Sequence, residues 1–179
     1  GQTAVVHGGG PIGIGVYFTL RRRGVDVIMV APSPTRRAVL SKLGVKTVLD
    51  PSTEDVVSAI KDLTGGRGAH ASVDAAGVPA AFDATLRGTA VDGSVVVVAI
   101  HTQPIRIDPM EILMSETRIT GVALSCNAFP HVIQEMAAGA YPMEGWVETI
   151  GLSSVVRDGF ERLHRQEGTK ILVDLARAA

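Results

Sequence analysis

Short apolar runs alternate along this chain with segments in which apolar residues recur every three or four positions. Alternation of this kind predicts β-strands that are each followed by an amphipathic α-helix. In the first such unit, the helix that follows the apolar run carries Ile12, Val16 and Leu20 on one face. The expected strands are, in order, Ala4–His7, Val27–Val30, Thr47–Leu49, Ala71–Asp74, Ser94–Ile100, Ile119–Ala123 and Lys170–Asp174.

Capping residues predict where the helices begin. Ser33 followed by Pro34 is typical of a helix start, because serine accepts a hydrogen bond from a free helix N–H and proline suits the first turn. Ser52 or Thr53 is expected to cap the next helix in the same way. The expected helices are, in order, Pro11–Arg23, the segment from Pro34 to Gly44, Glu54–Leu63, Pro79–Ala90, Phe129–Ala138 and Ser154–Gln166.

The order of these elements predicts the fold class. Ser94–Ile100 reads SVVVVAI, and so apolar a run is typical of a strand that is buried on both faces of a parallel sheet. We expect Asp92-Gly93 to form the turn that leads into it. Two successive β-α-β-α-β patterns indicate an α/β fold, with a doubly wound, mainly parallel six-stranded sheet and helices on both of its faces.

Composition excludes several classes of function. Hydrophobic residues make up 46% of the chain and the formal net charge is −1, so there is no basic surface for nucleic acid. The single cysteine, Cys126, excludes an internal disulfide and a multi-cysteine zinc site, and we interpret it as a structural thiol. No apolar run reaches the roughly 20 residues of a membrane span, and no secretory leader is recognisable, so we expect a cytoplasmic protein. Because Gly1 leads almost directly into a strand, we also expect a piece of a longer protein.

A glycine-rich loop lies between the first strand and the first helix. Its sequence GGGPIG satisfies the pattern G-x-G-x-x-G, and its place after a strand and before a helix is the context in which that pattern binds a dinucleotide. The first glycine permits a tight turn, the second lets the backbone approach a pyrophosphate, and the third lets helix and strand pack closely. We therefore expect a Rossmann dinucleotide-binding domain over residues 1–139. The alternative is a tight turn without a ligand. The cofactor-binding residues predicted here are Gly8, Gly10, Pro11, Ile12 and Gly13.

The end of the second strand bears on the choice of cofactor. NAD-binding domains carry an acidic residue there, about 20 residues after the first glycine, which accepts a hydrogen bond from the ribose 2′-hydroxyl. This chain has Ala31 instead, followed by Ser33 and Arg36. Without the acid, a 2′-phosphate is no longer repelled, and Arg36 can pair with it. We thus favour NADP over NAD. In the alternative, Ser33 is only a helix cap and the arginines point into water.

Several stretches in order along the chain resemble the cofactor-binding domain of the medium-chain dehydrogenase/reductase superfamily, in particular its zinc-type alcohol, polyol and butanediol dehydrogenases. These stretches are HGGGPIGIG, APSPTRR, KLGVKTVLDP, LTGGRGAHASVDAAG, VVVVAIH and ITGVALS, with a looser match in GFERLHRQEGTKILVD. The resemblance implies that a catalytic domain precedes this one, supplies the zinc ligands and lies outside the present sequence. It also implies that residues 140–179 lead back to that domain. We find no metal-ligand spacing within the chain itself.

The resemblance implies further roles for individual residues. Asp74 and Gly77, in a D-x-x-G step, would face the nicotinamide half of the cofactor. Ala99, Ile100 and His101 would lie beside the nicotinamide ring through backbone atoms. The alternatives are that Asp74 merely caps a turn and that His101 is a solvated loop residue. Two further positions complete the expected site and interface: Lys170 would meet the phosphates, and Ile119–Ala123 would form the edge strand of a homodimer.

The function expected from these observations is to bind a nicotinamide dinucleotide for an alcohol or polyol dehydrogenase and to orient it for hydride transfer. The chain on its own is expected to be inactive, because the zinc-binding catalytic domain is missing. Two alternatives remain: the cofactor domain of a zinc-free quinone or enone reductase, and a free-standing module that senses nucleotides.

Overall fold

The computed structural model describes residues 1–125 and 127–176, so Cys126 lies outside the described residues. A six-stranded sheet in the order β3-β2-β1-β4-β5-β6 forms the centre of the molecule, and all of its neighbouring strands are parallel. The strand order reverses between β1 and β4, and in such sheets the ligand crevice lies at the carboxyl ends of the strands around that point. The strands are β1 (Thr3–His7), β2 (Asp26–Val30), β3 (Thr47–Leu49), β4 (Ala69–Asp74), β5 (Thr89–Val97) and β6 (Arg118–Gly121).

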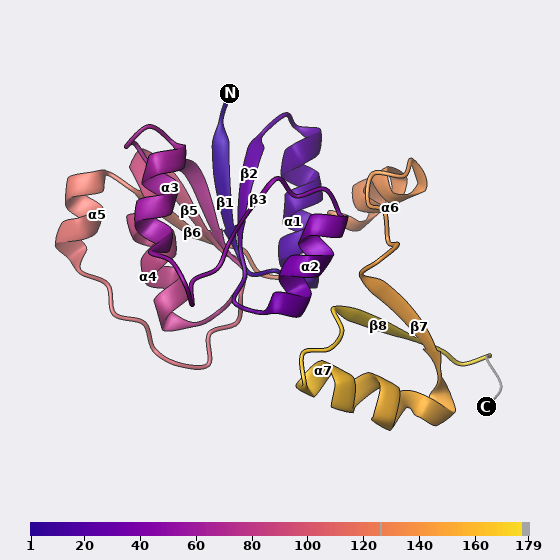
Figure 1. The fold of residues 1–179 in the computed structure, drawn as a ribbon. Helices are drawn as coiled ribbons and strands as arrows, with labels where there is room; N and C mark the ends of the chain where they lie inside the picture. The colour runs from indigo at the N-terminus through magenta and orange to yellow at the C-terminus, as the bar shows by residue number, and fades with distance from the viewer. Residues whose placement is uncertain (126, 177–179) are drawn as a thin grey trace.

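Helices cover both faces of this sheet (Figure 1). Helices α1 and α2 lie on one face, and α3 and α4 lie on the other. The doubly wound α/β fold expected from the sequence is thereby confirmed. The helices are α1 (Pro11–Arg22), α2 (Pro34–Lys42), α3 (Val56–Leu63), α4 (Pro79–Arg87), α5 (Pro109–Ser115) and α6 (Phe129–Ala137).

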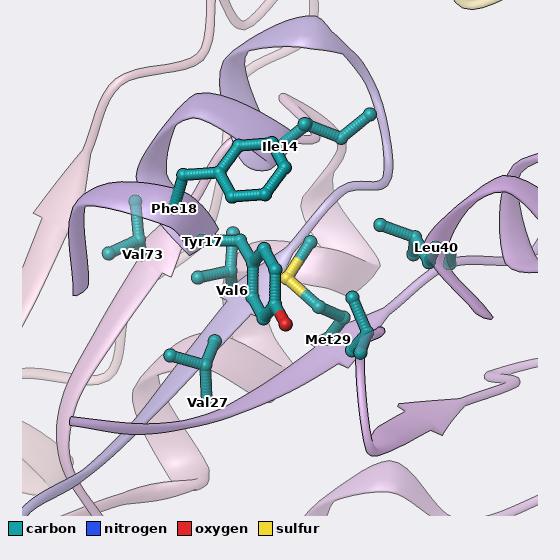
Figure 2. Packing of buried hydrophobic residues seen from close by; sticks show 10 residues of the cluster. Val6, Ile14, Tyr17, Phe18, Val27, Met29, Leu40 and Val73 are labelled. Carbon is teal, nitrogen blue, oxygen red and sulfur yellow. The ribbon is translucent and has the colours of Figure 1, made fainter. Parts of the chain in front are cut away.

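Neighbouring strand residues point to opposite faces of the sheet and so form two separate cores. On one face, Val6 and Met29 pack against Ile14 and Phe18 of α1 (Figure 2). On the other face, Val5, which directly precedes Val6 in the chain, packs with residues of β2, β3 and α3. Because both faces of the central strands are buried, apolar residues fill most positions of β1 and β2, as the sequence pattern indicated.

The C-terminal part of the described chain forms a second, smaller sheet of two parallel strands, β7 (Val147–Gly151) and β8 (Lys170–Asp174). The segment between them is helical: a 3-10 turn at Leu152–Ser154, a π-helix at Val155–Glu161 and α7 at Arg162–His164. The sequence predicted the helical segment and β8. It did not predict β7, whose Glu148 and Thr149 interrupt the apolar pattern. Trp146 packs against the first core.

Several elements differ from the sequence-based expectation. The cap of α3 is Asp55, not Ser52 or Thr53, because its carboxylate accepts hydrogen bonds from the N–H groups of Val57 and Ser58. β5 begins at Thr89, and Asp92, with a φ of +58°, lies within it beside a register irregularity rather than in a separate turn. Helix α5 was not predicted. Its side chains are largely exposed, and its N-cap is Asp108.

Candidate functional site

The glycine loop is held against the D-x-x-G turn by very close backbone contacts. Gly8 has a φ of +122°, and a β-carbon there would stand 2.7 Å from the carbonyl oxygen of Ala75. A β-carbon on Gly13 would stand 1.8 Å from the carbonyl oxygen of Gly8. Neither position can accept a side chain without movement of the backbone, so both glycines are required by the fold itself.

Gly10 differs from its neighbours, because nothing in the fold requires a glycine there. Its φ is −85°, which any residue adopts, and the nearest atom to a β-carbon at this position would be Nη1 of Arg36, at 3.8 Å. Gly10 is also the N-cap of α1, whose first turn has no side-chain cap and begins with Pro11. Open space beside uncapped N–H groups is the arrangement that binds a phosphate at a helix start. This favours a ligand over a plain tight turn.

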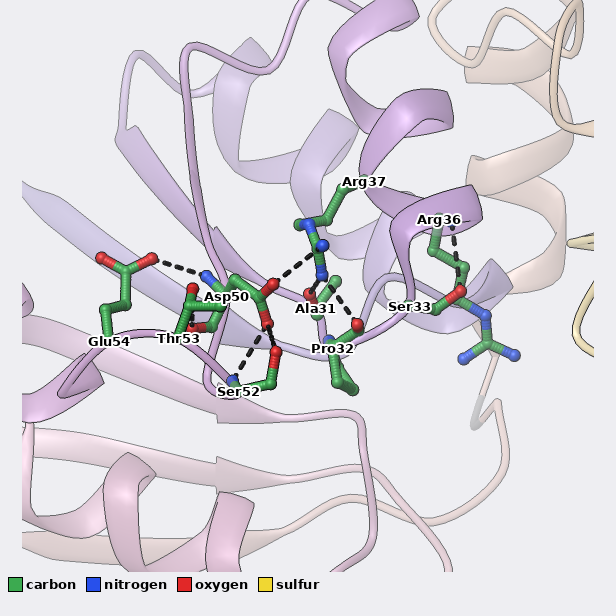
Figure 3. Close-up of polar contacts among 9 residues, drawn as sticks. All are labelled: Ala31, Pro32, Ser33, Arg36, Arg37, Asp50, Ser52, Thr53 and Glu54. Carbon is green, nitrogen blue, oxygen red and sulfur yellow. Dashed lines mark hydrogen bonds and ion pairs between the residues drawn. The ribbon is translucent and has the colours of Figure 1, made fainter.

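The turn after β2 contains the residues that bear on the choice of cofactor (Figure 3). Ala31 is fully buried, and its N–H donates to the carbonyl oxygen of Leu49 at 3.0 Å. Ser33 is the N-cap of α2, and its hydroxyl accepts a hydrogen bond from the N–H of Arg36 at 3.4 Å. The capping role predicted for Ser33 is thereby confirmed.

Arg36 and Arg37 have different surroundings. Arg37 donates to the carbonyl oxygens of Ala31 and Pro32, at 2.9 and 2.7 Å, and forms an ion pair of 2.8 Å with Asp50. Hydrogen bonds from Ser52, and the nearby charge of Arg37, lower the pKa of the Asp50 carboxyl. Arg36 has no carboxylate partner among the residues that the structure describes, and its buried Nε has no hydrogen-bond partner. Arg37 therefore fastens the turn, while the guanidinium of Arg36 is left available for an anion.

Asp74 joins the loops that follow β4 and β5. Its side chain is fully buried at the end of β4. Oδ1 accepts hydrogen bonds from the N–H groups of Ala76 and Gly77, at 2.9 and 3.0 Å, and Oδ2 lies 2.6 Å from Nε2 of His101. Asp74 therefore caps this turn, as the alternative interpretation had it, and it also contacts His101, so capping is not its only contact. His101 is not the solvated residue of the alternative interpretation, because its side chain is 16% exposed and lies edge-on to the ring of Phe82.

The backbone of Ala99 and Ile100 also lies against this turn. The N–H of Ala99 donates to the carbonyl oxygen of Asp74 at 3.1 Å. Gly77 has a φ of +73°, and a β-carbon there would stand 2.5 Å from the carbonyl oxygen of Ile100. Asp74, Gly77, Ala99, Ile100 and His101 are therefore brought together at the carboxyl ends of β4 and β5.

His7 is a buried polar residue that sequence reasoning did not assign. It ends β1 directly beside Asp74 in the sheet register, and its Nε2 has no hydrogen-bond partner. Burial lowers its pKa from 6.5 to about 4, although the charge of Asp74 acts in the opposite direction. Its ring is therefore neutral at neutral pH. The signal in the sequence was a histidine at the end of an otherwise apolar strand.

An apolar pocket of about 150 Å³ lies beside the glycine loop. Its walls come from four separate stretches of the chain, which is why the sequence alone did not reveal it. The lining residues are His7, Gly8, Val30, Pro32, Pro51, Val56, Ala76, Val78, Ala80, Ala81 and Ala84.

The remaining predicted positions lie on other elements. Lys170 begins β8 in the second sheet and is exposed, and its N–H donates to the carbonyl oxygen of Trp146. The strand expected at Ile119–Ala123 is β6, whose four residues are exposed at the edge of the large sheet. Within residues 1–125 and 127–176, no three His, Cys, Asp or Glu side chains gather as metal ligands would. None of the helices described is long and apolar enough to cross a membrane.

Comparison with known proteins agrees with this geometry. Residues 11–138 match the zinc-binding dehydrogenase family. The chain is 33% identical to (R,R)-butanediol dehydrogenase of Bacillus subtilis over 177 residues, which cover 97% of this chain and 51% of that protein. It is 30% identical to the Neisseria gonorrhoeae enzyme of the same name, covering 97% of this chain and 50% of that protein. The chain thus spans about half the length of these relatives.

Solved structures give the same result. The crystal structure of 2R,3R-butanediol dehydrogenase from Bacillus subtilis superposes with a TM-score of 0.88 at 31% identity, over 97% of this chain and 50% of that one. A zinc-dependent alcohol dehydrogenase from Streptococcus pneumonia, at 24% identity and a TM-score of 0.86, shares the fold. With the family match covering most of its length, the chain belongs to the zinc-binding dehydrogenases.

Proposed function

We propose that this chain binds a nicotinamide dinucleotide and orients it for a zinc-dependent alcohol or polyol dehydrogenase. The observation that carries the proposal is Gly10. No contact within the fold requires a glycine at this position, and the absence of a side chain leaves the start of α1 open. When bound, the cofactor supplies the exchange of a hydride with the substrate. The residues of this chain bind it and fix its orientation.

The crevice offers a separate environment for each part of such a ligand. The pyrophosphate would bind at the glycine loop, where Pro11 and Ile12 begin α1. The apolar pocket lined by Val30 and Pro51 suits the faces of the adenine ring. The nicotinamide half would then extend towards Asp74 and His101, at the ends of β4 and β5. Lys170 is retained as a phosphate ligand by family resemblance alone.

NADP is the cofactor that the turn after β2 favours. Ala31 offers neither a hydrogen-bond acceptor for a ribose 2′-hydroxyl nor a charge that repels a 2′-phosphate. Arg36 lies at the same turn with its guanidinium unpaired among the described residues. Its position 3.8 Å from the β-carbon site of Gly10 keeps that charge beside the phosphate loop.

Titration of the purified chain with NADP and NAD tests both the binding and the preference. We expect binding of both cofactors, with NADP bound about ten- to a hundredfold more tightly, as one charge-assisted hydrogen bond provides. Ala31→Asp should reverse that order, because it restores the acceptor and the repulsion together. Failure of the unmodified chain to bind either cofactor would refute the proposed function. A tenfold preference for NAD would refute only the role of Arg36.

The reaction itself requires residues outside this chain. We place the catalytic domain and its zinc in the half of the relatives' length that this chain does not cover. The zinc would polarise the substrate oxygen. The isolated chain is therefore expected to show no alcohol oxidation with zinc and either cofactor. Robust turnover by the pure chain would contradict this. A zinc-free reductase, and a free-standing nucleotide sensor in the cytoplasm, are the alternatives that the full reading frame would distinguish.

The edge of the large sheet is the interface we propose for a homodimer. Strand β6 pairs with β5 on one side only, so its outer edge has backbone N–H and C=O groups free to pair with another strand, and Ile119 within it and Val122 just after it are exposed. Light scattering at micromolar concentration should report a dimer. Val122→Lys should weaken that dimer, whereas Leu63→Lys, an equally exposed apolar site on α3, should leave it intact. A monomer in the unmodified chain would contradict the proposal.

A further inference from the structure

The contact between Asp74 and His101 joins the two loops that follow β4 and β5. The Asp74 carboxylate is fully buried, and the His101 ring contacts it and also lies nearly perpendicular to the ring of Phe82. We propose that His101 is a positioning residue, which acts through Asp74 to fix the backbone that receives the nicotinamide half of the cofactor. This inference rests on the proposed function.

The chemistry of the contact determines which atom carries the proton. Nε2 of His101 lies 2.6 Å from Oδ2 of Asp74, and because carboxylate oxygens accept hydrogen bonds, we assign Nε2 as the donor. The other ring nitrogen, Nδ1, is buried and has no hydrogen-bond partner. A bond to an ionised acceptor is roughly twice as strong as a neutral one, so it can hold the ring in one orientation.

Asp74 transmits this restraint to both loops. Its other carboxylate oxygen accepts the N–H groups of Ala76 and Gly77, and its backbone carbonyl oxygen accepts those of Val98 and Ala99. The side chain of His101 links the loop after β5 to the same carboxylate, so the two loops are joined by side-chain as well as backbone hydrogen bonds. The carbonyl of Ile100, between Ala99 and His101, is thus restrained from both sides.

The adenosine end of the crevice shares Ala76 with the turn that Asp74 caps, but its other walls come from β1, β2, the loop after β3, α3 and α4. The glycine loop, the turn at Ser33–Arg36 and the apolar pocket make no hydrogen bond to His101 among those that the structure describes. Loss of the His101 contact should therefore affect one half of a dinucleotide and spare the other. Misplacement of a binding group by about 1 Å is enough to lose much of its effect.

Two ligands separate the halves experimentally. NADPH contains the nicotinamide, and 2′-phospho-ADP-ribose lacks it while keeping the adenosine phosphates. His101→Leu removes the hydrogen bond, and His101→Gln supplies an amide N–H that can replace Nε2. We expect His101→Leu to weaken NADPH binding about tenfold, to leave the affinity for 2′-phospho-ADP-ribose within twofold, and to change the fluorescence of the bound nicotinamide. His101→Gln should restore both readouts.

Each outcome has one meaning. If the unmodified chain binds neither ligand, the proposed function fails. If it binds both, and His101→Leu weakens both equally or neither, the proposed function stands and the positioning role of His101 is refuted. Failure of the glutamine variant to restore NADPH binding would also refute it. If His101→Leu does not fold, as judged by its far-UV spectrum, His101→Asn replaces it, since its shorter amide cannot reach Asp74, and the same losses are expected.

Discussion

Arg36 and Arg37 are adjacent on α2, yet of the two guanidinium groups only that of Arg37 has hydrogen-bond and ion-pair partners among the described residues. Arg37 spans the end of β2 and the loop after β3, through the carbonyl oxygens of Ala31 and Pro32 and the carboxylate of Asp50. Arg36 contributes its backbone N–H to the Ser33 cap and leaves its side-chain Nε buried without a hydrogen-bond partner. Two neighbouring residues of one type therefore have a structural role and a proposed binding role.

This difference predicts that two alanine variants have different effects, one on stability and one on the choice of cofactor. Arg37→Ala should lower the midpoint of thermal unfolding by about 2–4 °C, because the turn loses its fastening, and should weaken both cofactors alike. Arg36→Ala should leave the midpoint unchanged and weaken NADP about ten- to a hundredfold more than NAD. Thermal unfolding and calorimetric titration of the two variants measure this. Equal effects on NADP and NAD in Arg36→Ala would exclude a contact with the 2′-phosphate.

Gly10→Val is predicted to abolish dinucleotide binding while the fold is kept. A β-carbon at this position meets no backbone atom within 4 Å, but a side chain there occupies the space in which a pyrophosphate would approach α1. Gly15→Ala is the matched control, since Gly15 lies in the same helix with open space around it. The valine variant should keep its far-UV spectrum and lose affinity by calorimetry, whereas the alanine control should keep both. Unchanged affinity in Gly10→Val would mean that the loop is only a turn.

Gly13→Ala should instead damage the fold. The added carbon would stand 1.8 Å from the carbonyl oxygen of Gly8, so the loop or the helix must move. Such overpacking costs about 1–3 kcal/mol or more, and denaturant unfolding should register that loss even without a cofactor. A stability equal to that of the unmodified chain would show that the loop relaxes freely.

The fold was largely predictable because both sides of the sheet are buried. Runs such as SVVVVAI and the helical spacing of apolar residues in α1 reflect that burial directly. Elements with little burial were missed: helix α5 has no buried residue, and β7 carries Glu148 and Thr149 towards its centre. The cap of α3 was misplaced because Ser52, Thr53 and Asp55 can all cap a helix, and the fold uses the last.

The site was predictable where one local segment defines it. The glycine loop and the Ser33 cap follow from a few consecutive residues. The apolar pocket, the ring of His101 against Asp74 and the burial of His7 arise only when separate strands end side by side, so spacing along the chain does not reveal them. Residue types alone also do not distinguish Arg36 from Arg37, because their difference lies in the direction of two side chains.

Burial of His7 predicts a specific dependence of stability on pH. Its pKa is about 4 in the folded chain and 6.5 when unperturbed, so between these values the unfolded chain binds a proton that the folded chain does not. The stability due to neutral His7 is therefore complete above pH 6.5 and is lost as the pH falls towards 4. At about 1.4 kcal/mol for each pKa unit, the loss over this range is about 3 kcal/mol.

His7→Leu should remove this loss, because leucine fills a similar volume and takes up no proton. The free energy of unfolding, measured by denaturant titration between pH 7 and pH 4, should fall more steeply for the unmodified chain than for His7→Leu. The variant His164→Leu, which removes an exposed histidine, should keep the steep fall and so controls for the removal of a histidine in general. Parallel curves for the unmodified chain and His7→Leu would mean that the folded chain accommodates a protonated His7, with its positive charge balanced by neighbouring Asp74.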